Sequence, residues 1–216
     1  MVFISLGFAC RVRESIDRFN SFRVETNFFD WLLTNFSTVL YVMQNIDQPD
    51  KFLTAEKFVK KGAYANNLTH FTVDHNQLYL SSLHDFPSTM DYFAYMPSFL
   101  EKYRRRLERL KHIIVTSQET IQFMHMIAFP STIPSTESIY YFVMAIKKMN
   151  ENCKYYLHLL IPPDLHNYAN QINSLVICPN IKIHYMYSIH KDVAMNEQRL
   201  DLNWNDVYKN ISVFYK

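Results

Sequence analysis

Glycine is scarce in this sequence, with two among 216 residues. A glycine at the end of an apolar run allows an unusual backbone angle or a close approach that other residues do not. Gly7 ends the apolar run Val2 to Leu6, three residues before Cys10. We therefore predict a buried strand over residues 2–6, followed by a tight turn at Gly7.

Cysteine is also scarce, and its pattern excludes the common metal and redox motifs. Cys10, Cys153 and Cys178 are widely spaced and form no Cys-x-x-Cys pair, so neither a zinc site nor a dithiol redox site is indicated. An odd number of dispersed cysteines favours a reducing compartment. We expect a cytoplasmic protein, in the host cytoplasm if a virus encodes it, with no cofactor.

Long hydrophobic runs and an excess of charge are absent as well. No apolar run reaches the ~20 residues that span a membrane, and the N-terminal residues lack the basic segment of a signal peptide. The formal net charge is +2, too small to indicate nucleic acid or an anionic membrane as the main partner. An unidentified substrate or another protein is the expected partner.

The chain has enough apolar residues, 49% of the total, for one sizeable core, and we expect a single domain over residues 1–216. Its second half alternates apolar strands (121–127, 155–161 and 181–187) with helical patterns (136–149 and 164–174). This alternation favours a parallel sheet with helices on both faces. The predicted fold class is α/β, a three-layer domain whose mostly parallel sheet includes residues 2–6.

The first half of the chain is less regular. Helices are predicted from Cys10, from about Phe36 and from Pro97, and a last amphipathic helix over residues 204–214. A strand is predicted over residues 76–87, because Pro87 cannot donate to a ladder and would end it. Residues 47–70 are predicted as a looser stretch.

Cys10 is the sharpest candidate for chemistry. The apolar residues that follow it recur at helical spacing, which places Cys10 in the first turn of a helix. The unpaired amide groups and the positive end of the helix dipole at that position lower the pKa of a thiol. The alternative is a buried structural cysteine, which is our interpretation of Cys153 and Cys178.

His84 is the candidate general base. It lies near the end of a predicted strand, with Asp85 or Asp30 as the carboxylate that would orient it. Adjacent strand residues point to opposite faces, so Asp85 need not face His84. Three other histidines hold comparable positions in the later strands, but their spacing is not that of a local ligand pair, and we expect no metal (His125, His158 and His184).

A basic run follows Pro97. It alternates with Tyr103, Leu107 and Leu110, which predicts an amphipathic helix over residues 101–112 with a partly exposed basic face (Arg104, Arg105, Arg106, Arg109 and Lys111). Such a face is either simply solvated or binds phosphate, nucleic acid or an acidic protein surface. The alternative is that Arg105 or Arg109 points inward and pairs with Asp30 or Asp85, which would give that residue a structural role.

Four stretches in this order, ISLGFAC, FFDWLLT, LHDFP and KYRRRLERL, resemble a family of papain-like cysteine peptidases known from bacteria and large DNA viruses. The resemblance covers about residues 3–127. It implies Cys10 as nucleophile and His84 as base, with Asp30 and Asp85 beside them. It also implies substrate-binding or supporting roles for four further residues: Gly7, Trp31, Arg105 and Arg109.

The sequence departs from the family pattern at Phe8, where members have a small residue, at Phe28, where they have proline, and near His125, where a strand arginine is replaced. The resemblance also implies an alternative fold, papain-like α+β, in which an antiparallel sheet carries the histidine. Periodicity instead predicts parallel strands over residues 121–187.

The leading functional hypothesis is a cysteine-dependent hydrolase or acyl transferase that uses Cys10 and His84. A second is a non-catalytic protein-interaction module of viral origin. A third is a transferase that binds a phosphate-bearing substrate through the arginine-rich helix.

Overall fold

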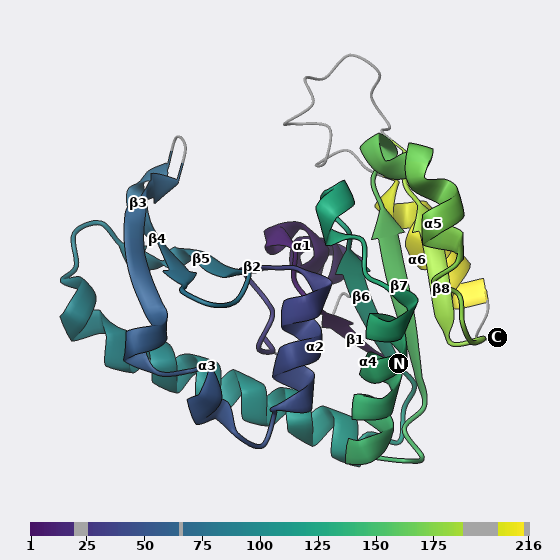
Figure 1. The fold of residues 1–216 in the computed structure, drawn as a ribbon, viewed down its shortest axis with the longest axis horizontal. Coiled ribbons are helices and arrows are strands. Elements are labelled where there is room, and N and C mark those ends of the chain that lie inside the picture. The colour runs from purple at the N-terminus through teal and green to yellow at the C-terminus, as the bar shows by residue number, and fades with distance from the viewer. Residues whose placement is uncertain (20–25, 65–66, 188–202, 214–216) are drawn as a thin grey trace.

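Two sheets organise the protein. The computed structural model describes residues 1–19, 26–64, 67–187 and 203–213 (Figure 1). Sheet A is parallel and has the order β1 (Val2–Ser5), β6 (Ile121–Met126), β7 (Tyr155–Ile161) and β8 (Ile181–Tyr185). Sheet B is antiparallel, with the order β2 (Leu32–Thr34), β5 (Leu80–Pro87), β4 (Asn67–His75) and β3 (Phe58–Tyr64).

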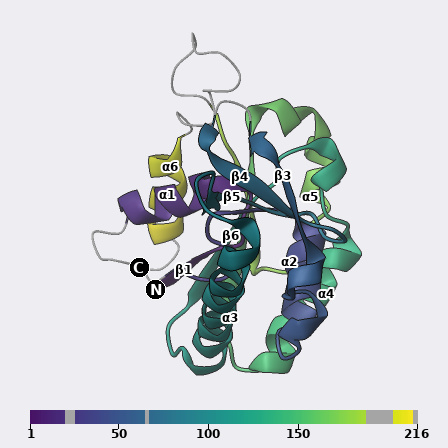
Figure 2. The same ribbon diagram turned by 90° about the vertical axis from the view of Figure 1, so that its left-hand side faces the viewer.

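Sheet A is buried on both faces, as a parallel sheet must be. Ile121 and Phe123 belong to a core shared with α2 (Phe36–Gln44) and α4 (Thr136–Met149), whereas Met124 and Met126 pack with α1 (Ala9–Phe19) and α6 (Trp204–Val213). Figure 2 shows these two pairs of helices on opposite sides of the sheet. The structure therefore confirms the predicted α/β fold with a mostly parallel sheet.

The predicted helices of the second half are also confirmed. α4 has the predicted bounds because Ser135 caps it and accepts a hydrogen bond from the backbone N–H of Ser138 at 3.0 Å. The weaker pattern over 164–174 corresponds to a 3-10 turn, Pro163–Tyr168, followed by the short helix α5 (Ala169–Asn173). Among the described residues, none of the helices combines the length and the hydropathy of a membrane-spanning segment.

Sheet B corrects the prediction of a looser stretch over residues 47–70. That stretch holds β3, the first four residues of β4 and two short 3-10 turns (Pro49–Lys51 and Ala55–Lys57). The sheet buries one face only, through side chains such as Phe58, Val73 and Phe86, while the outer positions of β3 carry exposed lysines. Bulges between β3 and β4 interrupt the alternation further, so the sequence pattern of these strands is weak.

The long helix α3 (Tyr92–Thr116) corrects a second prediction. It begins five residues before Pro97, because Asp91 caps it by accepting a hydrogen bond from the backbone N–H of Ala94 at 2.7 Å. Pro97 lies inside the helix and cannot bond the carbonyl of Phe93. Phe93 is 81% exposed, so water can reach that carbonyl.

The turn between β1 and α1 uses two consecutive residues with left-handed backbone angles. Gly7 has φ +86° and Phe8 has φ +58°. A Cβ atom on Gly7 would overlap the hydroxyl oxygen of Thr34, which sits directly over this glycine. Gly7 is therefore required for two reasons, the backbone angle and the close approach of Thr34.

We expect Gly7→Ala to destabilise the protein by about 3 kcal/mol or more, because the new methyl group meets Thr34 and the backbone angle disfavours any L side chain. The other glycine, Gly62 in β3, gives a matched control: a Cβ there meets nothing within 4 Å. Gly62→Ala should change stability by less than about 0.5 kcal/mol. Urea unfolding measures both, and equal effects would refute the role given to Gly7.

Candidate active site

Cys10 is the second residue of α1, directly after the Gly7–Phe8 turn. The turn follows the carboxyl end of β1, the edge of a parallel sheet at which α/β proteins place ligands. The predicted position of Cys10 at a helix N-terminus is thus confirmed. Its side chain lies outside the described residues, so its contact with His84 stays a prediction.

Contacts on both sides of Cys10 fasten α1 to the segment 30–34. Before it, Thr34 Oγ1 donates to the carbonyl of Leu6 at 3.0 Å. After it, Arg13 Nη1 donates to Asp30 Oδ2 at 2.9 Å in a buried ion pair. The first turn of α1 therefore runs alongside the short segment that contains Trp31 and β2.

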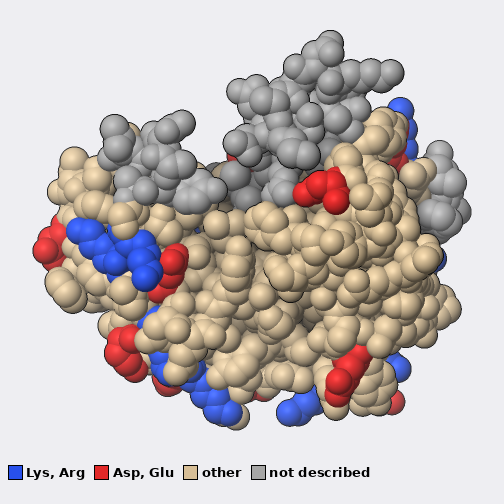
Figure 3. Space-filling view, turned by 45° about the horizontal axis from the view of Figure 1, so that its top comes forward, with Lys and Arg blue, Asp and Glu red and all other residues tan. Residues whose placement is uncertain are grey.

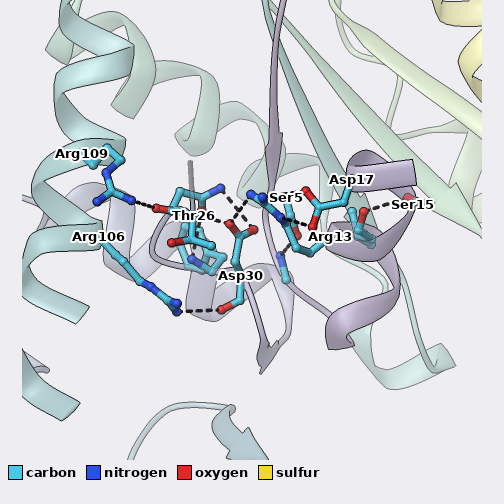
Figure 4. Close-up of polar contacts among 12 residues, drawn as sticks. Ser5, Arg13, Ser15, Asp17, Thr26, Asp30, Arg106 and Arg109 are labelled. Atoms are coloured by element: carbon cyan, nitrogen blue, oxygen red, sulfur yellow. Dashed lines mark hydrogen bonds and ion pairs between the residues drawn. The ribbon is translucent and has the colours of Figure 1, made fainter. Parts of the chain in front are cut away.

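Asp30 is the centre of a buried polar cluster (Figure 4). It accepts hydrogen bonds from the backbone N–H of Asn27 at 2.8 Å and from Arg13, which also pairs with Asp17. Burial raises the pKa of Asp30 to about 6, although Arg13, Asn27 and Arg106 each act to lower it. Its contacts make Asp30 the anchor of the turn that precedes Trp31.

The helix α3 holds the same turn from the other side (Figure 4). Arg106 Nη1 donates to the carbonyl of Asp30 at 3.4 Å, and Arg109 Nη1 donates to the carbonyl of Thr26. Arg109 was predicted to bind substrate, and in the structure its described contact is with the chain's own backbone. The turn at residues 26–31 is thus bound on one side by α1 and on the other by α3.

His84 is exposed near the end of β5 and lies beside Trp31. The two rings meet edge to face with their centroids 6.4 Å apart. Trp31 has φ +70°, an angle rare for a bulky residue and one that the anchored turn imposes. His70 of β4 lies on the other side, also with a centroid distance of 6.4 Å. His84 therefore lies between two aromatic neighbours on an accessible surface.

Asp85 faces away from His84, as strand alternation allows. It is buried and accepts hydrogen bonds from Ser82 Oγ at 2.5 Å and from Tyr103 OH at 2.7 Å, and it pairs with Lys102. Burial alone would raise the pKa of Asp85, but Lys102 and these hydrogen bonds outweigh it and lower the pKa. Among the described contacts, neither Asp85 nor Asp30 bonds His84; Asp85 ties β5 to α3.

The basic face of α3 is only partly exposed. Arg104 donates to Asp50 at 2.6 Å and to the carbonyl of Leu53 at 3.0 Å. Arg105 remains exposed, with Glu101 at 4.0 Å. Most of the basic run thus binds the protein's own chain while Arg105 stays exposed, in agreement with the predicted partly exposed face. The position of this face beside Cys10 stays a prediction.

The three strand histidines do not converge on one point. His158 of β7 and His184 of β8 are hydrogen-bonded to each other at 2.8 Å, and His158 Nε2 bonds Gln122 Oε1 at 2.7 Å. His125 of β6 is separate and bonds the carbonyl of Leu6. Within the described ranges, no three side chains of the metal-binding types gather in one place.

Thr34 and His70 are not among the residues predicted from the sequence, and no supporting role is predicted there for Lys102 and Tyr103. Thr34 carries no signal in a single sequence, since threonine is an ordinary strand residue. Tyr103 was assigned to the apolar stripe of α3, and it does pack there while its hydroxyl bonds Asp85. Only the spatial pairing of β4 with β5 brings His70 to His84.

The histidine pair predicts a loss of stability in acid. Burial lowers the pKa of His158 to about 3, helped by His184 and Lys182, and lowers the pKa of His184 to about 4. Both are neutral in the fold, while an unfolded histidine titrates near ~6.5. The stabilisation is therefore complete above about pH 6.5 and is lost as the pH falls toward 4.

His158→Gln should reduce the slope of unfolding free energy against pH by about 1.4 kcal/mol per pH unit between pH 6 and 4.5, because one titrating group is removed. Asp30 acts with the opposite sign, since its raised pKa favours the fold below pH 6. The comparison is therefore between variant and wild type, by urea unfolding at each pH. Identical slopes would contradict the neutral buried pair.

Comparison with known proteins identifies the family. Residues 1–161, which span α1, the whole of sheet B, α3 and strands β6 and β7, match the family model described as "putative papain-like cysteine peptidase". No curated protein and no solved structure matches the chain. Since the matched region is most of the chain and contains the candidate nucleophile and base, the protein belongs to this family.

Proposed function

We propose that the protein is a cysteine-dependent hydrolase or acyl transferase in which Cys10 is the nucleophile and His84 the general base. One observation carries the proposal. The first turn of α1, which bears Cys10, is fastened at Leu6 and at Arg13 to the segment whose Trp31 contacts the exposed His84. Membership of a family described by its cysteine chemistry supports a cysteine nucleophile.

The chemistry follows from these positions. His84 removes the thiol proton of Cys10, and the thiolate sulfur attacks the carbonyl carbon of an acyl substrate. The negative charge that develops on the carbonyl oxygen is stabilised by backbone N–H groups at the N-terminus of α1. The proton passes to the leaving group, and water or another acceptor then takes the acyl group from the sulfur.

Asp30, Asp85 and Trp31 do not replace this pair in the proposal but position the segments around it. Asp30 fixes the turn that presents Trp31, and Trp31 lies against one side of the His84 ring. Asp85 fixes β5 on the opposite face of the sheet by its bonds to α3. In this proposal both carboxylates are positioning residues, and Trp31 is the residue of the three that is placed to meet substrate.

The phosphate-binding alternative has less support. Most of the basic side chains of α3 that would bind phosphate instead bind the protein's own backbone and carboxylates. Arg105 is exposed, with only a long ion pair to Glu101. On the face drawn in Figure 3, the Lys and Arg side chains lie toward the margins, and the charged group nearest the centre is acidic. These observations favour an acyl substrate over a phosphate-bearing one, and they give no particular support to a purely protein-binding role.

Cys10 should react with iodoacetamide at pH 6.5 about tenfold faster than Cys153, because a thiol at a helix N-terminus is ionised more readily than a buried one. Burial raises the pKa of Cys153, so this residue is an internal reference within the same protein. His84→Ala should remove most of the advantage at pH 6.5. Mass mapping of the alkylated peptides measures both rates.

His70→Ala is the matched control, since His70 neighbours His84 on the same face of sheet B. It should leave the alkylation of Cys10 unchanged. The proposal fails if Cys10 is inert until pH 8 or if both histidine variants behave alike. Loss of activity in Cys10→Ala and His84→Ala, with unchanged unfolding curves, would extend the result to catalysis.

A further inference from the structure

Leu6 directly precedes the Gly7–Phe8 turn that leads into α1. Its carbonyl accepts hydrogen bonds from two side chains that belong to different elements. Thr34 Oγ1 of β2 donates to it at 3.0 Å, and His125 Nδ1 of β6 lies 3.3 Å from it. The N–H of the same residue donates to the carbonyl of Met124 at 2.8 Å. The backbone immediately before the turn is therefore held from both sides.

The chemistry of these contacts fixes the state of His125. A carbonyl oxygen only accepts, so Nδ1 carries the proton and Nε2 is an unprotonated acceptor. Nε2 is buried and has no partner among the described residues. The hydrogen bond to Leu6 is thus the one polar contact described for this ring, which otherwise packs against Phe36 with a centroid distance of 5.3 Å.

Thr34 acts on the turn in a second way. Its hydroxyl lies against the Cα atom of Gly7, where no Cβ would fit, and the N–H of Gly7 donates to Ser5 Oγ at 3.2 Å. The turn is therefore confined by contact as well as by hydrogen bonds. Phe8, which has φ +58°, follows directly and leads into the helix that carries Cys10.

We propose that Thr34 and His125 are positioning residues for the nucleophile: by donating to the Leu6 carbonyl they set the direction in which α1 leaves the turn, and hence where Cys10 stands. We call this arrangement the Leu6 clamp. The proposal rests on the proposed function of Cys10, and it assigns to two buried side chains a role in thiol activation that neither family membership nor sequence pattern gives them.

Two pairs of variants separate the hydrogen bonds from the packing. Thr34→Val removes the hydroxyl and keeps the shape, whereas Thr34→Ser keeps the hydroxyl. His125→Leu removes the donor, whereas His125→Asn keeps an amide N–H close to the place of Nδ1. Each pair is compared by the rate of Cys10 alkylation with iodoacetamide between pH 5.5 and 9, alongside its melting temperature.

In Thr34→Val and in His125→Leu we expect the alkylation rate at pH 6.5 to fall about fivefold, the loss typical of one hydrogen bond, and the midpoint of the pH profile to move up. Thr34→Ser and His125→Asn should stay within about twofold of the wild type. If His125→Leu does not fold, the comparison of Thr34→Val with Thr34→Ser tests the proposal by itself.

A lower melting temperature with an unchanged pH midpoint in the folded variants would show that the Leu6 clamp only stabilises the fold, and this would overturn the proposal. Failure of the proposed function is recognised separately, in the wild type. In that case Cys10 of the wild type would show no reactivity below pH 8 and no dependence on His84. The positioning role of the Leu6 clamp would then be refuted together with the proposed function.

Discussion

The contact between Thr34 and the Leu6–Gly7 backbone joins the two halves of this protein. Leu6 and Gly7 continue β1 of the parallel sheet, while Thr34 ends β2 of the antiparallel sheet. Because Gly7 has no side chain, the two sheets approach closely at this point. This contact fixes the start of α1 relative to β2, the strand that pairs with the His84-bearing strand β5.

Buried charge completes this frame. The pair Arg13–Asp30 links α1 to the turn before β2, and Asp85 with Lys102 links β5 to α3. Removing one partner of such a pair leaves the other buried and unpaired, which costs several times more than a surface ion pair contributes. Carboxylates and arginines that resemble catalytic groups in the sequence therefore act here mainly to hold backbone segments in place.

The arrangement also reconciles two expectations that conflicted in the sequence. Periodicity predicted parallel strands over residues 121–187, and the family resemblance implied an antiparallel sheet carrying the histidine. Both are present, since β6, β7 and β8 are parallel and His84 lies on the antiparallel sheet B. The resemblance to the family and the α/β fold class are therefore compatible.

What could be predicted from the sequence depended on burial. β6 and β7 are mostly apolar because both faces are covered, and the sequence pattern identified them. β3 and β4 bury one face and carry bulges, so the pattern that identifies a strand was lost. The start of α3 had a local signal in Asp91, which the presence of Pro97 obscured.

The candidate site divides in the same way. Cys10 could be placed at a helix N-terminus because the apolar spacing after it is local. The opposite orientations of His84 and Asp85 followed from strand alternation. Thr34, His125 and His70 acquire their roles from contacts between residues far apart in the sequence, which no local pattern records.

The most direct test of this account is a chemical cross-link. 1,3-Dibromoacetone carries two electrophilic carbons and joins a thiolate to an imidazole that stands close to it. After treatment of the wild type near pH 6.5 and proteolysis, we predict one major cross-linked species, the peptide containing Cys10 joined to the peptide containing His84. Attachment to Cys10 alone, or a link from Cys10 to any other residue, would contradict the central claim that these two sheets bring the pair together.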